Sequence, residues 1–279
     1  MNIILFDEPV IRQSLLPLTF TRPVAGMRVG IMTIAEKWQK YAVATVSYLT
    51  QPYLQQKFAA QFQPGSLYVN GAVCPDVQLV QQVKALQAGE SLWHDGLMVA
   101  LHAGDEEFKT VEDLANHTFE AKKECQPETV IREVWEIFVN NGQQIRSDFK
   151  VLTEGRQSQP IDDKYTMVYG EENIFIEEGV KIRAAILNAE NGPIYIGKNA
   201  QIHEGAVVKG PFAICENSNV NVGGKMRGDV TIGPFSKVGG EVAASVIFGY
   251  SNKGHEGYLG NSVLGEWCNL GADTNTSNL

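Results

Sequence analysis

The clearest pattern in the sequence is an apolar residue at every sixth position over the last third of the chain. The run is unbroken from Ile196 to Val238, and its members are Ile196, Ile202, Val208, Ile214, Val220, Met226, Ile232 and Val238. Units of six residues fold as short strands, three to a triangular coil, and each coil buries its apolar face by stacking on its neighbours. The period therefore predicts a left-handed parallel β-helix built from hexapeptide repeats.

The period is interrupted near the end of the chain. Between Ala244 and Leu264 the interval is twenty residues, which is not a multiple of six. We therefore expect this glycine-rich segment to leave the coil as a loop. Loops carried on a rigid scaffold are common places for function.

Ahead of the repeats, strand and helix signals alternate. Residues 2–6 form a short apolar run that stops before Pro9, which predicts a first strand. Further elements are expected as a helix over Ile31–Tyr41, strands over Ala42–Leu49 and Ser66–Asn70, a helix from its cap Asp76 to Leu86, and a helix over Glu128–Arg146 broken near Asn140. The alternation favours an α/β layered domain.

A polar stretch separates the two patterns. It runs from Leu152 to Lys164 and contains Gly155 and Pro160, so we place the linker there. The expected domains are residues 1–160 and residues 161–279.

Composition narrows the possible functions. A net charge of −9 argues against a nucleic-acid binder, because neutralising phosphates needs clustered Lys and Arg. No apolar run approaches the roughly 20 residues that a membrane span needs. The four cysteines are far apart and form no CxxC pair. These features predict a cytoplasmic protein with reduced thiols, no membrane contact and small-molecule partners.

Polar residues near the end of the chain form a pattern with fixed spacing. His255 is followed by Tyr258, by the stretch from Asn269 to Thr274, which reads Asn-Leu-Gly-Ala-Asp-Thr, and by Asn278. This pattern resembles the acetyltransferase half of the GlmU family, the bifunctional glucosamine-1-phosphate N-acetyltransferases and N-acetylglucosamine-1-phosphate uridylyltransferases. The family has a histidine, a tyrosine three residues on, an Asn-Ile-Gly-Ala-Gly-Thr motif and a further asparagine.

The resemblance implies that His255 is the general base that deprotonates the amino group of glucosamine 1-phosphate during its attack on acetyl-CoA. Imidazole suits this role because it titrates near neutral pH. Contacts to the sugar phosphate and the thioester carbonyl are implied for Tyr258, Asn269 and Asn278. Lys225 falls where the family has a phosphate-binding arginine, with Arg227 nearby, whereas Ala243 replaces a family lysine.

The resemblance also implies an assembly. Family members form homotrimers, whose active sites lie between neighbouring solenoids. They continue through further coils that bind the CoA arm, beyond the position of Leu279 in this sequence.

The run Leu-Leu-Pro-Leu-Thr-Phe-Thr-Arg-Pro from residue 15 resembles sugar nucleotidyltransferases fused to hexapeptide repeats. Such enzymes cradle a nucleoside triphosphate on a glycine-rich loop. This chain departs from that pattern, because residues 6–12 contain no glycine and two carboxylates. If the site is active, the resemblance implies phosphate contacts by Arg12, Arg22 and Arg28 and a Mg²⁺ ligand in Asp7 or Asp76.

A structural alternative has the arginines paired with acidic neighbours, namely Asp7, Glu8 and Glu36. Three functions therefore stay open. The first is a two-domain transferase that acetylates an amino-sugar 1-phosphate and transfers a nucleotidyl group, towards UDP-N-acetylglucosamine or a similar product. The second is a nucleotidyltransferase with a structural β-helix. The third is a non-catalytic scaffold that binds sugar phosphates.

Overall fold

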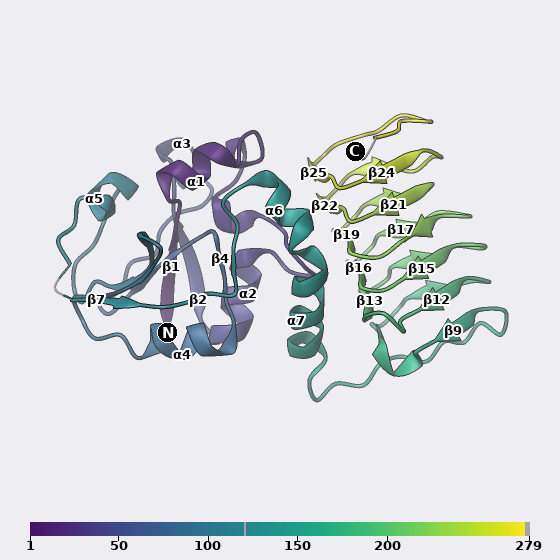
Figure 1. The fold of residues 1–279 in the computed structure, drawn as a ribbon, viewed down its shortest axis with the longest axis horizontal. Coiled ribbons are helices and arrows are strands. Elements are labelled where there is room, and N and C mark those ends of the chain that lie inside the picture. The colour runs from purple at the N-terminus through teal and green to yellow at the C-terminus, as the bar shows by residue number, and fades with distance from the viewer. Residues whose placement is uncertain (120, 277–279) are drawn as a thin grey trace. The chain divides into compact units, whose positions relative to one another are not determined.

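The computed structural model describes residues 1–119 and 121–276, which form two compact units. The first comprises Met1–Met27 with Met32–Val134, and the second comprises Arg28–Ile31 with the chain from Trp135 onward. Figure 1 follows the chain through both units by colour. The second unit takes in helical residues from Trp135 onward, which precede the boundary predicted at residue 160. That boundary stays a prediction.

A six-stranded sheet in the order β2-β1-β3-β6-β5-β7 forms the centre of the first unit. Its strands are β1 (Asn2–Phe6), β2 (Thr45–Leu49), β3 (Leu67–Asn70), β5 (Glu90–His94), β6 (Leu97–His102) and β7 (Ala121–Glu124). The expected first strand is confirmed as β1. It is parallel to β2 and β3 and buried along its whole length, as an apolar strand between two neighbours should be.

Short helices connect these strands. They are α1 (Pro9–Ser14), α2 (Ile34–Ala42), α3 (Pro52–Gln55), α4 (Val77–Lys84) and α5 (Val111–Ala115), and a small sheet pairs β4 (Val73–Cys74) with β8 (Thr129–Val130). The cap at Asp76 is confirmed, since its side chain accepts a hydrogen bond from Leu79. Helix α2 begins later than expected because Thr33 is its N-cap and forms a capping box with Glu36 in the first turn.

Two helices lead into the solenoid. They are α6 (Val134–Val139) and α7 (Asn141–Thr153), so the predicted break near Asn140 is confirmed. Helix α7 continues into the stretch expected to be linker. It does so because Phe149 and Leu152 pack, with Ile145, against Tyr195 and Ala213 on the outside of the solenoid.

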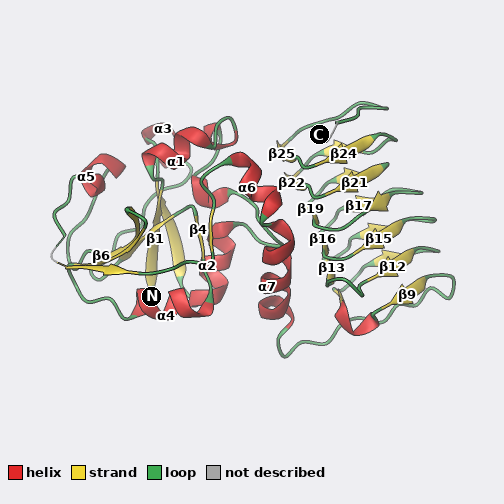
Figure 2. Ribbon diagram, in the orientation of Figure 1, coloured by secondary structure: helices red, strands yellow, loops and turns green. Residues whose placement is uncertain are grey.

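The chain beyond α7 is a left-handed parallel β-helix, as its period predicts. Three parallel sheets form its walls. In chain order the strands are β9 (Met167–Tyr169), β10 (Ile174–Ile176), β11 (Lys181–Ile182), β12 (Ile186–Asn188), β13 (Ile194–Ile196), β14 (Gln201–Ile202), β15 (Val207–Lys209), β16 (Phe212–Ile214), β17 (Asn219–Val220), β18 (Lys225–Met226), β19 (Val230–Ile232), β20 (Lys237–Val238), β21 (Glu241–Ala243), β22 (Val246–Gly249), β23 (Asn252–Lys253), β24 (Tyr258–Gly260) and β25 (Val263–Glu266). Figure 2 shows strands and loops through this region, with a short helical turn near β9.

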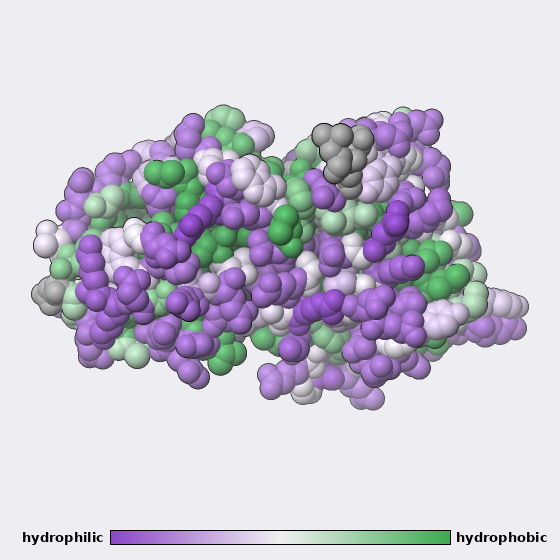
Figure 3. All heavy atoms as spheres, in the orientation of Figure 1, coloured by the Kyte–Doolittle hydropathy of each residue, from purple (hydrophilic) through white to green (hydrophobic). Residues whose placement is uncertain are grey.

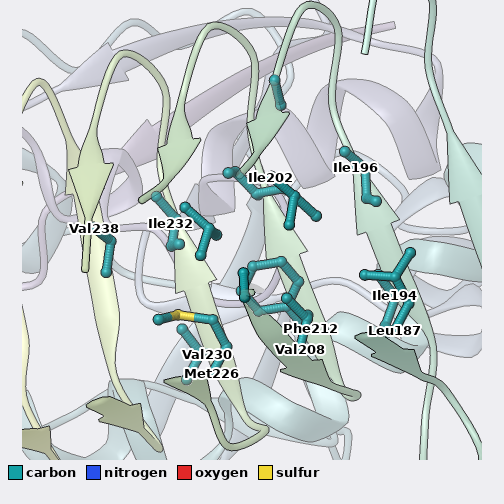
Figure 4. Packing of buried hydrophobic residues seen from close by; sticks show 14 of the residues in the cluster. Leu187, Ile194, Ile196, Ile202, Val208, Phe212, Met226, Val230, Ile232 and Val238 are labelled. Atoms are coloured by element: carbon teal, nitrogen blue, oxygen red, sulfur yellow. The ribbon is translucent and has the colours of Figure 1, made fainter. Parts of the chain in front are cut away.

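The predicted inward positions are confirmed. All eight members of the six-residue period, from Ile196 to Val238, are at most 1% exposed. Figure 4 shows how several of them stack from coil to coil with Leu187 and Phe212. Burying each Ile or Val stabilises the fold by roughly 1.5 to 3 kcal/mol, so the stacked coils supply a core of their own.

The expected loop between Ala244 and Leu264 is wrong. Strands β22, β23 and β24 pair in register with the coil before them, so the chain stays in the solenoid. The period is lost because this coil is shorter: Val238 pairs with Lys253 and not with a residue eighteen positions on. The inward position at this point is taken by a lysine, which is 2% exposed.

Hydrophilic side chains cover most of the surface visible in Figure 3. Among residues 1–119 and 121–276, no helix combines the length and the apolar character needed to cross a membrane.

The cysteines differ in accessibility, which gives a first testable prediction. Burial raises the pKa of the Cys125 thiol to about 11, and this side chain is 4% exposed, whereas Cys268 is half-buried. Because the thiolate is the reactive species, we expect iodoacetamide at pH 8 to alkylate Cys268 well before Cys125 in the native protein. Mass spectrometry of the two peptides over time measures this order, and equal rates would contradict it.

Candidate functional site

One face of the solenoid gathers the predicted cations and the predicted tyrosine. Lys225 on β18 pairs with Glu241 on β21, which pairs in turn with Tyr258 on β24. Their strand neighbours Met226, Val242 and Leu259 are buried, so alternation along each strand turns these three side chains outward. The structure thus brings Lys225 and Tyr258 onto one sheet, with a carboxylate between them.

Glu241 also contacts the second predicted cation. Arg227 Nη1 lies 2.8 Å from Glu241 Oε1, and this hydrogen bond raises the pKa of the arginine. Glu241 is absent from the sequence-based site. A strict eighteen-residue repeat would pair Lys225 with Ala243, and only the shortened coil brings Glu241 beside it.

His255 lies at the corner between β23 and β24, and it is exposed. Glycines flank the corner, and Gly257 has a φ of +123°, which disfavours other residues. The amide of Tyr258 donates to Asn275 Oδ1 at 2.7 Å, so the next coil fixes the start of β24. The histidine is therefore presented beside the sheet that carries Tyr258.

The predicted asparagines fall in different places. Asn269 forms a parallel β-bridge with Asn252 on β23, the strand that precedes the corner with His255. Asn252 Nδ2 also donates a hydrogen bond to Asn269 Oδ1 at 2.8 Å. Asn278 lies outside the described residues. Asn252 and Asn275 were not predicted, since only the stacking of coils reveals their contacts.

In the first unit, Asp7 and Arg12 form a buried ion pair. Arg12 Nη1 lies 3.2 Å from Asp7 Oδ2, and the two residues are 8% and 1% exposed. The same carboxylate accepts hydrogen bonds from the amide of Val24 at 2.7 Å and the hydroxyl of Thr50 at 2.5 Å. Burial raises the pKa of Asp7 despite these contacts. Arg12 also donates to the Tyr53 hydroxyl at 2.7 Å.

This arrangement bears on the predicted Mg²⁺. Three hydrogen bonds already occupy the two oxygens of Asp7, one of them from a cation, so the carboxylate as placed does not fit a metal ligand. Asp76 caps helix α4 through a 2.7 Å bond from Leu79. Within the described part of the chain, no three His, Cys, Asp or Glu side chains form a group suited to a metal. The metal roles of both residues stay predictions.

The other predicted phosphate contacts lie apart from this pair. Arg22 is half-buried between two short helical turns of the first unit. Arg28 belongs to the second unit, where its guanidinium donates to the backbone carbonyls of Ile31 and Phe248. Arg28 thus fastens its own segment to the solenoid.

An apolar cavity of about 180 Å³ opens at the end of β1 in the first unit. Its lining includes Phe6, Glu8, Trp93, Met98 and Leu114. In open α/β sheets, ligands bind outside the carboxyl ends of the parallel strands, which is where this cavity lies.

Comparison with known proteins identifies a family and several relatives of this chain. The model of the sugar nucleotidyl transferase family matches residues 3–157. A bifunctional protein GlmU from Synechococcus elongatus is 27% identical over 161 residues, which cover 50% of this chain and 35% of the relative. A bifunctional protein GlmU from Trichodesmium erythraeum is 30% identical over 86 residues, or 30% of this chain and 18% of the relative.

The chain thus spans about a third of the length of the first of these relatives. The family model nevertheless covers more than half of the chain, and the solenoid that follows agrees with the likeness to GlmU. The chain therefore belongs to the sugar nucleotidyl transferase family, as a divergent GlmU-like transferase with a β-solenoid.

Proposed function

We propose that the solenoid transfers an acetyl group from acetyl-CoA to the amino group of glucosamine 1-phosphate. The observation that carries this proposal is the exposed His255 beside the outward face formed by Lys225, Arg227, Glu241 and Tyr258. A base next to paired cations suits a substrate that carries both an amine and a phosphate. Membership of a family of nucleotide-sugar biosynthesis supports such a substrate.

In the proposed reaction the His255 imidazole accepts a proton from the sugar amine as the nitrogen attacks the thioester carbonyl carbon. The new C–N bond forms, the C–S bond breaks, and CoA leaves as its thiol after protonation. Lys225 attracts the phosphate. Arg227 adds positive charge, although Glu241 already neutralises part of it.

Tyr258 and Asn269 would orient the sugar phosphate and the thioester, and Asn278 keeps the same proposed role. The resemblance further supports a homotrimer, in which a neighbouring solenoid completes each site. A typical general base contributes about 10² to 10⁴ in rate, which is the contribution we propose for His255.

Nucleotidyl transfer in the first unit is the second candidate. The apolar cavity at the end of β1 favours it, since an apolar wall suits a nucleobase. Arg12 and Arg22 are its proposed phosphate contacts, with Arg12 already engaged by Asp7. The Asp7 oxygens accept hydrogen bonds from Arg12, Val24 and Thr50, so this candidate function gives Asp7 no role in holding Mg²⁺.

Two assays on the full chain separate these functions. We expect thiol release from acetyl-CoA that depends on glucosamine 1-phosphate. The parallel assay measures pyrophosphate release from UTP with a sugar 1-phosphate. Pyrophosphate release alone would favour a nucleotidyltransferase with a structural solenoid. If neither product forms while glucosamine 1-phosphate still binds, the protein is a sugar-phosphate scaffold.

A further inference from the structure

A lysine lies inside the solenoid where every neighbouring coil has an apolar residue. Lys253 follows Val220 and Val238 in the same stack, and it is 2% exposed. Its Nζ donates to the backbone carbonyl of His255 at 2.9 Å. Burial lowers the pKa of this lysine, as expected for a cation withdrawn from water.

The carbonyl that Lys253 contacts belongs to the corner at residues 254–257, which is held by several hydrogen bonds. Each of the four consecutive carbonyls in residues 254–257 accepts a hydrogen bond. The other three donors are Asn221 Nδ2 to Gly254 at 2.9 Å, the Asp273 amide to Glu256 at 3.0 Å and the Glu241 amide to Gly257 at 3.1 Å. The His255 carbonyl is the one held by a charged side chain from the coil interior.

The neighbouring coil leaves this carbonyl little space. A Cβ atom at Gly240 would lie 2.9 Å from the His255 oxygen, so only glycine permits the observed approach. The carbonyl is thus fixed by close packing on one side and by the ammonium of Lys253 on the other.

An apolar residue at position 253 would continue the stack at lower cost, because a buried ammonium loses its hydration. The lysine therefore needs a compensating role, and its ammonium donates a hydrogen bond to the histidine of the proposed site. We infer that Lys253 is a positioning residue, whose ammonium holds the His255 carbonyl from inside the coil and so fixes the corner that presents the imidazole. This inference rests on the role proposed for His255.

The bond itself can be tested by its spectroscopic signature. Labelling histidine with carbonyl ¹³C and glutamate with ¹⁵N selects the two His-Glu peptide bonds of this chain, His203-Glu204 and His255-Glu256. In Lys253→Met we expect the His255 carbonyl resonance to move by about 1 ppm to lower frequency, because a charge-assisted hydrogen bond is lost. The His203 resonance is the internal reference and should not move.

The kinetic consequence is tested on the same variant. We expect Lys253→Met to lower kcat for acetyl transfer about tenfold, with KM for glucosamine 1-phosphate changed less than about twofold, because misplacing the base affects the chemical step more than binding. Lys237→Met is the matched control, since Lys237 is exposed on the adjacent strand β20. Its kcat should equal that of the wild type.

Three results separate the possibilities. An unmoved His255 resonance, or an unchanged kcat beside an active wild type, overturns the inference. If the wild type shows no acetyl transfer, the proposed function fails, while the carbonyl resonance still decides whether Lys253 holds the corner. Should Lys253→Met fail to fold, Lys253→Gln keeps a shorter donor and should give a smaller shift of the same sign.

Discussion

The His255→Ala variant should lose about 10²- to 10⁴-fold in the rate of acetyl transfer. The loss is expected because the proposed reaction needs a general base at this corner, and imidazole is the side chain best suited to that role near neutral pH. Folding should be unaffected, since His255 is exposed and the methyl of alanine fits any such corner. Release of the CoA thiol in the presence of glucosamine 1-phosphate measures the rate.

The chain offers a matched control for this prediction. His203 follows β14, three strands below β23 in the same sheet, and it is also partly exposed. We expect His203→Ala to retain the wild-type rate. If His255→Ala were as active as His203→Ala, His255 would not be the base.

Asp7→Ala should destabilise the first unit by about 3 to 5 kcal/mol, the range seen when one partner of a buried ion pair is removed. The guanidinium of Arg12 would stay buried without its carboxylate, and the Val24 amide and Thr50 hydroxyl would lose their acceptor. Urea-dependent hydrogen exchange at the amides of β1 reports the unfolding free energy of this unit.

Asp76→Ala is the comparison, because both residues were predicted as metal ligands. Asp76 is a helix cap, and losing such a cap costs typically about 1 kcal/mol. An Asp7→Ala protein that unfolds no more easily than Asp76→Ala would contradict the structural role of the ion pair. It would also mean that the Asp7 carboxylate is available to bind a metal ion.

Much of the solenoid is predictable because its buried positions recur every six residues. The eight residues at this period from Ile196 to Val238 are all apolar and buried, so the period predicts both the fold and these interior residues. The coil with Lys253 breaks this rule, since a lysine normally indicates an outward position. Its place follows from the pairing with Val238 in the shortened coil, which a strict count of six residues does not reveal.

The candidate site was predictable in part for the same reason. His255 and Tyr258 are found from their spacing, and the structure brings Tyr258 onto the sheet of Lys225. Glu241 was missed because its pairing depends on a coil sixteen residues long. The resemblance implies a phosphate contact for Arg28, and that role stays a prediction. Its hydrogen bond to the Phe248 carbonyl could not be predicted, because Phe248 lies far along the chain.

The central claim is that an amino-sugar phosphate binds at the outward face of the solenoid. Hydrogen-exchange mass spectrometry of the full chain, with and without glucosamine 1-phosphate, tests it most directly. We predict slower exchange in peptides covering residues 225–227, 241–243 and 254–260, and no change at residues 203–209. Protection confined to residues 6–22 of the first unit, or no protection at saturating ligand, would contradict the claim.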